Sequence, residues 1–412
     1  MTKTDLYPRY IKSLLLEALK DSPAVLIHGP RQCGKTTLAQ IVGKPKKYKY
    51  ISFDDNVITE AAKADPIGFV KNLPKKVILD EVQRTPHLFS TLKREIDSYR
   101  IPGRFILTGS ASILRLPKLS DSLAGRMQIL RLHPLSQGEL SQRKSRFLDV
   151  LFKGRFKTGK ISNSFNQLIN QIVMGGYPEV FTRPTGRRRI NWYRSYIETV
   201  IKRDIMDLSK ARSIDILPRL LAVSATQTSQ LVNFTSLASS FQVSRTTICD
   251  YVALLEQMFF LEKLPPWYNS RLRRFIKTPK LHLCDTGLAC TLLGVSASSL
   301  KKDRLLSGQL LETFVFQELR RQASYHNQHH SFFYYRDKKG HEVDIVIERD
   351  HKVAGVEVKF SATVNLSDFK GLRKFKTTVG KHFACGVILY NGDTSIGFGN
   401  GFYAIPLNTL WL

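Results

Sequence analysis

The chain has 412 residues, of which 42% are hydrophobic and 24% are charged, so an extended disordered chain is excluded and two or three globular domains are expected. Its 63 Lys and Arg outnumber its 34 Asp and Glu, which gives a formal net charge of +29. Because such an excess repels itself unless an anion is nearby, nucleic acid is the expected partner, with a lysine-rich source proteome as the plainer alternative.

The sequence carries no signal for export or membrane insertion. Its five cysteines form neither a C-x-x-C pair nor a Cys/His cluster, which indicates reduced thiols. Residues 1–20 lack a continuous apolar segment, and no stretch approaches the roughly 18 apolar residues of a spanning helix. We therefore expect a soluble, cytoplasmic protein with no membrane partner.

Short apolar runs alternate with helical stretches through the first third of the chain. Strand-like runs cover residues 24–27, 50–53, 76–80, 104–108 and 127–132. Apolar strands at this spacing, with helices between them, indicate a parallel sheet covered on both faces. The predicted fold class of this part is α/β.

A phosphate-binding loop follows the first of these strands. It matches the pattern G-x-x-x-x-G-K-[ST] and consists of Gly29, Pro30, Arg31, Gln32, Cys33, Gly34, Lys35 and Thr36, with Thr37 directly after it. The glycines let backbone N–H groups turn towards phosphates, and the N-terminus of the next helix adds positive potential. Lys35 is expected to reach the β- and γ-phosphates of ATP, and the Thr36 hydroxyl to bind Mg2+.

The ends of two later strands carry groups that suit hydrolysis. Asp80 ends the third strand, where its carboxylate would hold Mg2+, and Glu81 follows in position to orient or deprotonate the attacking water. Thr108, at the end of the fourth strand, would sense the γ-phosphate. Asp-Glu and Thr-Gly-Ser sequences also occur in ordinary turns, but their position after a P-loop favours the catalytic interpretation.

Arg126 is the candidate for stabilising the charge of the transition state. Surface arginines are plentiful in this chain, so spacing alone gives this residue limited support. The sequence leaves open whether Arg126 would act within its own subunit or on a neighbour in a homo-oligomer.

Residues 8–140 resemble the ATPase domain of a bacterial and archaeal group of AAA+-superfamily ATP-binding proteins. The resemblance rests on Asp80-Glu81-Val82-Gln83, Leu107-Thr108-Gly109-Ser110, Leu123-Ala124-Gly125-Arg126 and Pro134-Leu135-Ser136. Two later segments, Gly175-Gly176-Tyr177-Pro178-Glu179 and residues 280–288, extend it over nearly the whole chain. It implies an ATPase followed by a C-terminal domain of unknown function.

The middle of the chain has the pattern of a helix-turn-helix. A short helix is expected over residues 234–241, followed by a turn and a second helix over residues 245–258 that Ser244 caps. The second helix would present Arg245, Thr246 and Thr247 to a DNA groove. A wing would follow over residues 259–283, with Arg271, Arg273 and Arg274 available for phosphates. Winged helices also serve as protein-interaction modules, so that alternative stays open.

The C-terminal part carries a group of carboxylates on two adjacent predicted strands. Side chains alternate along a strand, so Glu357 and Lys359 share one face, and Asp344 on the preceding strand can lie beside Glu357. Glu312, on a helix over residues 307–323, could add another carboxylate. Carboxylate oxygens suit Mg2+, which can bind a scissile phosphate, while Lys359 could position the attacking water.

This set is similar to that of the PD-(D/E)XK nuclease superfamily, although no proline precedes Asp344. The resemblance implies a fold like that of restriction endonucleases and a nuclease site formed by Glu312, Asp344, Glu357 and Lys359. Two alternatives remain: Glu-x-Lys is also a common solvated ion pair on a strand, and such folds persist as binding domains after losing cleavage.

We therefore expect an α/β multidomain protein with three units. These are an ATPase with a helical lid over residues 1–185, a helical, winged-helix-like unit over 186–300, and a nuclease-like unit over 301–412. The expected function is Mg2+-dependent ATP hydrolysis coupled to action on DNA, with cleavage by the C-terminal unit as a hypothesis. The alternative is a nucleotide-driven switch that binds a protein partner and cuts nothing.

Overall fold

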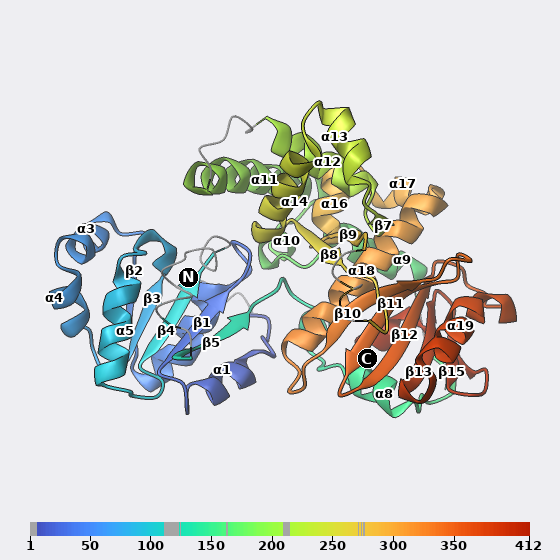
Figure 1. The fold of residues 1–412 in the computed structure, drawn as a ribbon, viewed down its shortest axis with the longest axis horizontal. Coiled ribbons are helices and arrows are strands. Elements are labelled where there is room, and N and C mark those ends of the chain that lie inside the picture. The colour runs from blue at the N-terminus through green and yellow to red at the C-terminus, as the bar shows by residue number, and fades with distance from the viewer. Residues whose placement is uncertain are drawn as a thin grey trace.

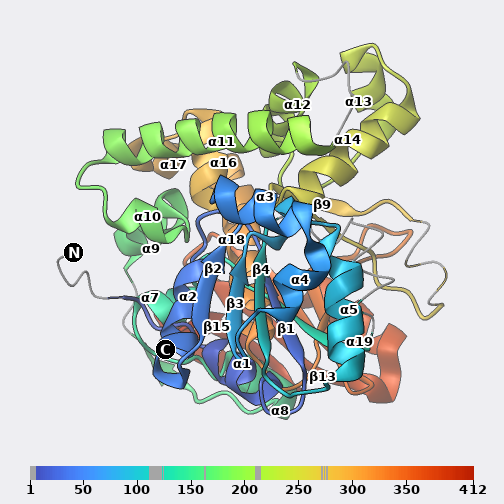
Figure 2. The same cartoon turned by 90° about the vertical axis from the view of Figure 1, so that its left-hand side faces the viewer.

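The structure, a computed structural model, describes residues 6–110, 123, 125–161, 164–208, 215–270, 272, 274 and 277–412. Figure 1 shows a parallel sheet with its helices on the left, a mixed sheet on the right, and a helical unit above them. In Figure 2 the parallel sheet faces the viewer and the long helix α11 crosses above it. No helix in the described part of the chain is long and apolar enough to span a membrane.

The N-terminal sheet has five parallel strands in the order β2-β3-β4-β1-β5. They are β1 (Ala24–His28), β2 (Lys49–Ser52), β3 (Val77–Asp80), β4 (Phe105–Gly109) and β5 (Met127–Arg131). The apolar runs of the sequence predicted all five. Because β4 lies between β1 and β3, its residue Thr108 pairs with Ile27 of β1 and also contacts Asp80 of β3.

Helices cover both faces of this sheet, as the apolar runs predicted. They are α1 (Lys12–Ala18) and α2 (Lys35–Gly43) on one face, and α3 (Asn56–Ala64), α4 (Pro66–Lys71) and α5 (Leu88–Ser98) on the other. Strand β1 shows why: Val25 and Ile27 are buried with α1 and α2, whereas Leu26 is buried with α5. A strand that is apolar at every position is stable only between two such layers.

The middle unit combines helices with a small antiparallel sheet in the order β7-β9-β8. Its elements are α9 (Phe165–Met174), α10 (Pro178–Phe181), α11 (Gly186–Leu208), α12 (Ile216–Thr226), β7 (Gln230–Leu231), α13 (Phe234–Phe241), α14 (Arg245–Gln257), β8 (Leu261–Leu264), β9 (Lys280–Leu283), α16 (Thr286–Leu293) and α17 (Ala297–Lys302). The predicted cap is confirmed, since Ser244 Oγ accepts a 3.0 Å hydrogen bond from Thr247 N.

The C-terminal sheet has seven strands in the order β10-β11-β12-β13-β15-β14-β6. They are β10 (Ser331–Arg336), β11 (Glu342–Arg349), β12 (Lys352–Lys359), β13 (Phe383–Tyr390), β14 (Thr394–Gly397), β15 (Phe402–Pro406) and β6 (Gly159–Lys160). Helix α19 (Lys370–Val379) packs on one face, while α18 (Arg304–Ser324) and α8 (Phe147–Lys153) pack on the other.

The chain changes partners soon after the short helix α7 (Gln137–Leu140). Helix α8 packs against β12 and β13, and β6 pairs with β14, so residues 147–160 lie on the C-terminal sheet. The division expected from the sequence placed these residues with the ATPase. One apolar core runs through the middle and C-terminal units from Phe147 to Trp411, whereas the N-terminal sheet has two core clusters of its own.

Candidate functional site

The P-loop joins the end of β1 to the start of α2. Leu132 directly follows β5, and a Cβ atom at Gly29 would lie 2.1 Å from its carbonyl oxygen. Only glycine therefore lets the loop pass so close to this segment. Gly34 has a φ of +96°, which also favours glycine. These two positions turn the loop so that the N-terminus of α2 faces its interior, where backbone N–H groups and the helix dipole favour an anion.

The remaining loop residues hold this shape. Cys33 is buried and its thiol contacts the Leu132 carbonyl at 3.5 Å, while burial raises the pKa of the thiol above its usual value. Pro30 is buried, whereas Gln32 and Thr37 are exposed. The Arg31 carbonyl accepts a 3.3 Å hydrogen bond from Tyr196 on α11. The loop is therefore anchored on one side by its own sheet and on the other by the middle unit.

Lys35 is buried at the first position of α2. Its Nζ donates to the carbonyl oxygens of Gly29 at 3.1 Å and Pro30 at 2.8 Å. The side chain thus curls over the loop and holds its ammonium inside the concave face. This is the position from which an ammonium can bind phosphate oxygens.

Asp80 is the centre of a hydrogen-bonded group at the carboxyl edge of the sheet. Thr36 Oγ1 donates to its two oxygens at 2.9 and 3.1 Å, Tyr50 donates at 2.7 Å, and the Thr108 hydroxyl donates as well. Burial and the bond to Asp80 raise the pKa of Tyr50 to about 12, so it stays a donor. A hydroxyl and a carboxylate that converge in this way are oxygen donors of the kind Mg2+ prefers, so these residues fit the ion.

Glu81 is held in an unusual conformation next to Asp80. Its φ of 57° and ψ of 44° place it in the left-handed region, which costs a residue other than glycine about 1 kcal/mol or more. Gln83 donates from its amide to the Glu81 carboxylate and also to Ser110 Oγ at 3.1 Å, and Arg31 lies 3.9 Å from the same carboxylate. Gln83 entered the sequence analysis only through a family resemblance, and here it is the residue that positions Glu81.

Arg126 does not join this group within its own chain. It immediately precedes Met127, which pairs with Ala24 at the start of β1, whereas the P-loop follows the opposite end of β1. Its Nη2 lies 3.0 Å from Asp97 Oδ2 at the end of α5. The sequence alone does not predict this separation of Arg126 from the phosphates. It depends on the parallel pairing of β5 with β1, which places Arg126 near the start of β1.

This sheet, with its P-loop and paired acidic residues at the carboxyl edge, defines a P-loop ATPase. Residues 21–141 match an AAA domain, residues 165–299 match a domain of unknown function (DUF8612), and residues 307–410 match another domain of unknown function (DUF4143). Residues 21–141 are therefore an AAA-type P-loop ATPase domain, and residues 307–410 near the C-terminus are a DUF4143 domain.

Relatives cover most of the chain. The uncharacterized protein Rv2008c of Mycobacterium tuberculosis is 28% identical over 397 residues, which are 96% of this chain and 82% of that protein. The uncharacterized protein MJ1544 of Methanocaldococcus jannaschii is 25% identical over 342 residues, or 79% of this chain and 72% of that protein. Among solved structures, the Walker-type ATPase of Pyrococcus abyssi covers 71% of this chain and 97% of its own, at 15% identity and a TM-score of 0.44.

A second polar group lies where α18, β11 and β12 meet β9 of the middle unit. Lys280 Nζ lies 2.8 Å from Glu312, 2.6 Å from Glu342 and 3.6 Å from Asp344. We call these four residues and Glu357 the C-terminal carboxylate cluster. The structure thus brings together Glu312, Asp344 and Glu357, but it adds Lys280 and Glu342, which the sequence analysis did not select.

Glu357 and Lys359 lie on the neighbouring strand β12. Lys359 Nζ is 3.8 Å from Glu357 Oε1 and 3.7 Å from Asp368, and Asp344 Oδ2 accepts a 2.9 Å hydrogen bond from Val358 N. The other oxygen of Glu357 is buried and has no hydrogen-bond partner among the described residues. Burial, followed by the charge of Asp344, raises the pKa of Glu357 well above its usual value.

The cluster as arranged does not fit Mg2+. Lys280 Nζ lies among the carboxylates that would ligate the ion, and its side chain is 4% exposed. Burial by itself lowers the pKa of Lys280, but the charges of Glu312, Asp344 and Glu342 hold it above its usual value, so the ammonium persists. Among the described residues, no three His, Cys, Asp or Glu side chains are grouped to hold a metal ion.

Two of the segments that carry the family resemblance, residues 175–179 and 280–288, meet at the buried side chain of Asp285. Its Oδ1 accepts from Gly287 N at 3.0 Å and from the Tyr193 hydroxyl at 2.9 Å. Its Oδ2 accepts from Gly176 N at 2.7 Å and lies 3.1 Å from Arg321 Nη2. The carboxylate caps α16 and joins it to α11 and α18, which gives these segments a structural role.

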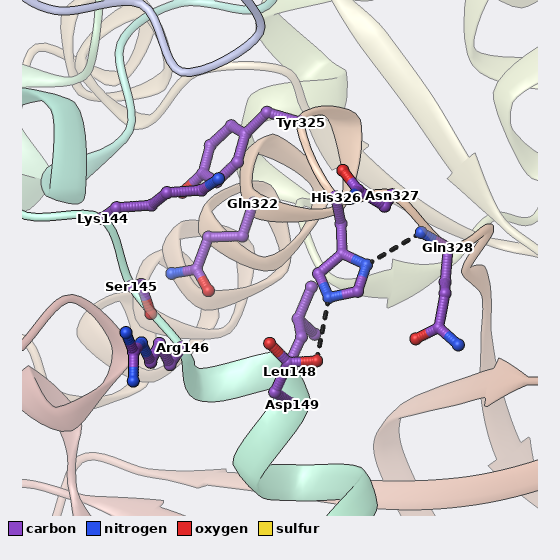
Figure 3. Close-up of a pocket in the computed structure, with 10 residues that line it drawn as sticks. All are labelled: Lys144, Ser145, Arg146, Leu148, Asp149, Gln322, Tyr325, His326, Asn327 and Gln328. Carbon is purple, nitrogen blue, oxygen red and sulfur yellow. Dashed lines mark hydrogen bonds and ion pairs between the residues drawn. The ribbon is translucent and has the colours of Figure 1, made fainter. Parts of the chain in front are cut away.

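A cavity of about 510 Å3 lies between α8 and the C-terminal end of α18 (Figure 3). His326 Nε2 lies 3.1 Å from Asp149 Oδ1, and Gln328 N donates to His326 Nδ1 at 3.0 Å, as the dashed lines show. Because Nδ1 accepts, Nε2 is the protonated nitrogen and donates the hydrogen bond to Asp149. This pair fastens α8 to the segment after α18.

Proposed function

We propose that the chain is a Mg2+-dependent AAA+ ATPase that acts on DNA. The observation that carries the first half is the convergence of Thr36, Asp80 and Glu81 beside the P-loop. Mg2+, when bound, would neutralise charge on the phosphates. Lys35 would bind the same phosphates, and Glu81, held by Gln83, would orient the attacking water.

Nucleotide binding is tested with Lys35→Ala. Loss of the ammonium should weaken ATP affinity and abolish turnover, because no other buried cation described in this chain lies inside the loop. Lys44→Ala is the matched control, since Lys44 is exposed at the other end of α2. Equal ATP affinity in the two variants would contradict the assignment of the loop.

The proposal of DNA binding rests on charge and on two surfaces. In the middle unit, α12, β7, α13, α14, β8 and β9 follow one another as in a winged helix, and Arg245 and Thr246 are exposed at the start of α14. Thr247 is engaged by Ser244, and Arg274 is bonded to Glu348, so neither suits DNA. Arg271 and Arg273 lie outside the described residues.

The second surface is on the C-terminal unit. The order α18, β10, β11, β12, α19, β13, with the carboxylates on α18, β11 and β12, supports a PD-(D/E)XK nuclease-like unit. Lys370, Arg373 and Lys374 are exposed on α19. The start of α19 touches the cluster, because a Cβ atom at Gly371 would lie 1.9 Å from the carbonyl oxygen of Glu342. A phosphate backbone near the cluster would therefore meet these cations.

DNA binding is tested by titrating a duplex at several salt concentrations. Each phosphate contact contributes about 0.9 to the slope of log affinity against log salt, so a steep slope is expected. Replacing Arg373 and Lys374 together with alanine should reduce it, and the same change at exposed Lys46 and Lys47 serves as control. A flat response would contradict the DNA half of the proposal.

The second candidate is a nucleotide-driven switch that binds a protein partner. The position of Lys280 within the carboxylate cluster favours this alternative over cleavage. Plasmid nicking by the wild type and by Lys359→Ala, with Mg2+ or Mn2+, distinguishes them. Cleavage that Lys359→Ala abolishes would support a nuclease, whereas a flat salt response without cleavage would support the switch.

Arg126 is assigned a role only between chains. We propose a homo-oligomer in which Arg126 of one subunit approaches the nucleotide of the next, because its own P-loop lies at the opposite edge of the sheet. Its present partner, Asp97, is on the surface, so the exchange of partners requires no change in the core.

A further inference from the structure

Lys280 lies among the carboxylates that a nuclease-like unit would use to hold a divalent ion. We propose that Lys280 is the built-in cation of the C-terminal carboxylate cluster and that it excludes a divalent metal ion from it. The inference rests on the proposed nuclease-like nature of this unit and adds how its site is controlled. A unit with this arrangement holds DNA without cutting it while Lys280 stays in place.

The distances argue for exclusion rather than coexistence. Lys280 Nζ lies 2.8 Å from Glu312 Oε1 and 2.6 Å from Glu342 Oε1, which are contacts of charge-assisted hydrogen bonds. Mg2+ needs oxygen ligands at about 2.0–2.1 Å in a nearly octahedral arrangement. An ion that used the same oxygens would overlap the ammonium, and two adjacent cations would repel each other.

The backbone of Lys280 is fixed on both sides. β9 is the central strand of the small sheet, and Lys280 is paired with Leu231 on β7 and Leu264 on β8. Its side chain is 4% exposed, and its Nζ lies 5.7 Å from the centre of the Tyr334 ring. The backbone that carries the ammonium is therefore held next to the cluster by strands on both sides.

The negative charges of the buried carboxylates explain why a cation is needed at the position of the Lys280 ammonium. Lys359 contacts Glu357 and Asp368, and Arg336 contacts only the outer side of Glu342, at 3.7 Å, so Lys280 is the cation shared by Glu312 and Asp344. Without it, buried carboxylates would face one another. They would then take up protons or attract a metal ion, and the buried free oxygen of Glu357 would add a ligand.

Terbium luminescence tests the inference, because Tyr334 is close enough to sensitise Tb3+ at this position. All variants carry Asp80→Asn, which removes the metal ligand of the nucleotide site. The probe is Tb3+ and the competitor is Mn2+. Lys280→Met should gain a saturable signal that Mn2+ displaces, with an affinity at least about tenfold above that of the Asp80→Asn protein. Adding Asp344→Asn should abolish the gain.

Lys263→Met is the matched control. Lys263 lies on β8, pairs with Glu256 at 2.7 Å and is outside the cluster, so its replacement should create no Tb3+ site. If Lys280→Met does not fold, the double variant Lys280→Met/Glu342→Gln removes one charge of each sign and carries the test. Circular dichroism and thermal melting with and without Mn2+ report on folding, and Mn2+ should raise the melting temperature of the folded variant only.

Two results would overturn the inference. One is a saturable Tb3+ signal in the protein that retains Lys280, lost on Asp344→Asn, since a metal ion would then displace the ammonium. The other is a folded Lys280→Met variant that binds neither ion, since the lysine would then be an ordinary structural ion pair. Neither result depends on ATP turnover or on DNA binding, which are measured separately, so failure of the proposed function is distinguishable.

Discussion

Thr108 connects the two acidic residues of the nucleotide site. Its hydroxyl donates to Asp80 and accepts a 3.2 Å hydrogen bond from Glu81 N, so one side chain contacts both the carboxylate proposed to hold Mg2+ and the backbone of the left-handed residue Glu81. Gln83 then bridges Glu81 and Ser110. A change at the γ-phosphate that shifts the end of β4 would therefore reach Glu81 directly.

Gln83→Ala should slow hydrolysis without weakening ATP binding. The Glu81 carboxylate would keep its charge but lose the amide that orients it, so kcat should fall on the order of tenfold or more. Steady-state kinetics and direct measurement of ATP affinity check this. Gln142→Ala is the matched control, because Gln142 is exposed and follows α7. An unchanged kcat would contradict the positioning role.

The lowered pKa of His28 predicts that the folded protein loses stability in acid. Burial, with the charges of Arg131 and Lys35, lowers its pKa to about 4, so the folded protein resists a proton that the unfolded chain accepts near pH 6.5. The contribution is complete above pH 6.5 and is lost as pH falls from there towards 4, by roughly 2 kcal/mol at pH 5.

Denaturant unfolding of the wild type and His28→Gln at pH 7.5 and pH 5 measures this contribution. The other buried histidines act in both proteins, so the difference between the two isolates His28. The wild type should lose about 2 kcal/mol more than the variant between the two pH values. Equal losses would show that His28 is not the proton acceptor.

At the level of secondary structure, strand β9 connects two buried ionic groups. It begins with Lys280, which enters the carboxylate cluster, and it leads into Asp285, which joins α16, α11 and α18. Gly175 shows how tight this junction is, because it has a φ of +69° and a Cβ atom there would lie 2.1 Å from Asp285 Oδ1. Motion of β9 would therefore affect both the carboxylate cluster and the junction at Asp285.

Asp285→Asn should destabilise the protein by about 3 kcal/mol. The amide keeps the size of the carboxylate but leaves Arg321, which is 5% exposed, as a buried charge without its partner. Asp303→Asn is the control, because Asp303 is an exposed cap of α18 and asparagine caps equally well. The midpoint of thermal unfolding checks both, and equal shifts would contradict the role of the ion pair.

Sequence patterns predicted the local elements better than the contacts between them. The five strands of the parallel sheet, α13, α14, α18 and the two C-terminal strands that carry the carboxylates follow from apolar periodicity, turns and caps. The pattern did not predict β6, because this strand is only two residues long and pairs with β14, which is distant in the sequence.

Lys280 shows the same limit within the candidate sites. Its residue type is ordinary for a strand in a basic protein, and 64 positions separate it from Asp344. Only the packing of β9 against α18 and β11 brings the two together. The sequence did identify Glu312, Asp344 and Glu357, but it gave no reason to select Glu342, and the cation between these carboxylates belongs to another unit.

At the scale of the whole molecule, several polar contacts join the N-terminal ATPase unit to the rest of the chain, among them the ion pair of Arg131 on β5 with Glu262 on β8 at 3.4 Å. Tyr196 bonds the P-loop carbonyl of Arg31, Arg321 bonds the Leu135 carbonyl at 2.8 Å, and Gln137 N bonds Glu318 at 2.8 Å. Its apolar clusters are largely separate from the large core that the other two units share. The middle and C-terminal units therefore share one core, and these polar contacts connect the N-terminal unit to it.

Hydrolysis of ATP by the group around Asp80 and Glu81 can be measured directly. Turnover and nucleotide affinity of the wild type and Glu81→Gln, measured with Mg2+, test it most directly. The variant keeps the size of the side chain but loses the carboxylate that orients water, so turnover should fall about a hundredfold or more while ATP affinity stays within about threefold. Unchanged turnover in Glu81→Gln would contradict the account.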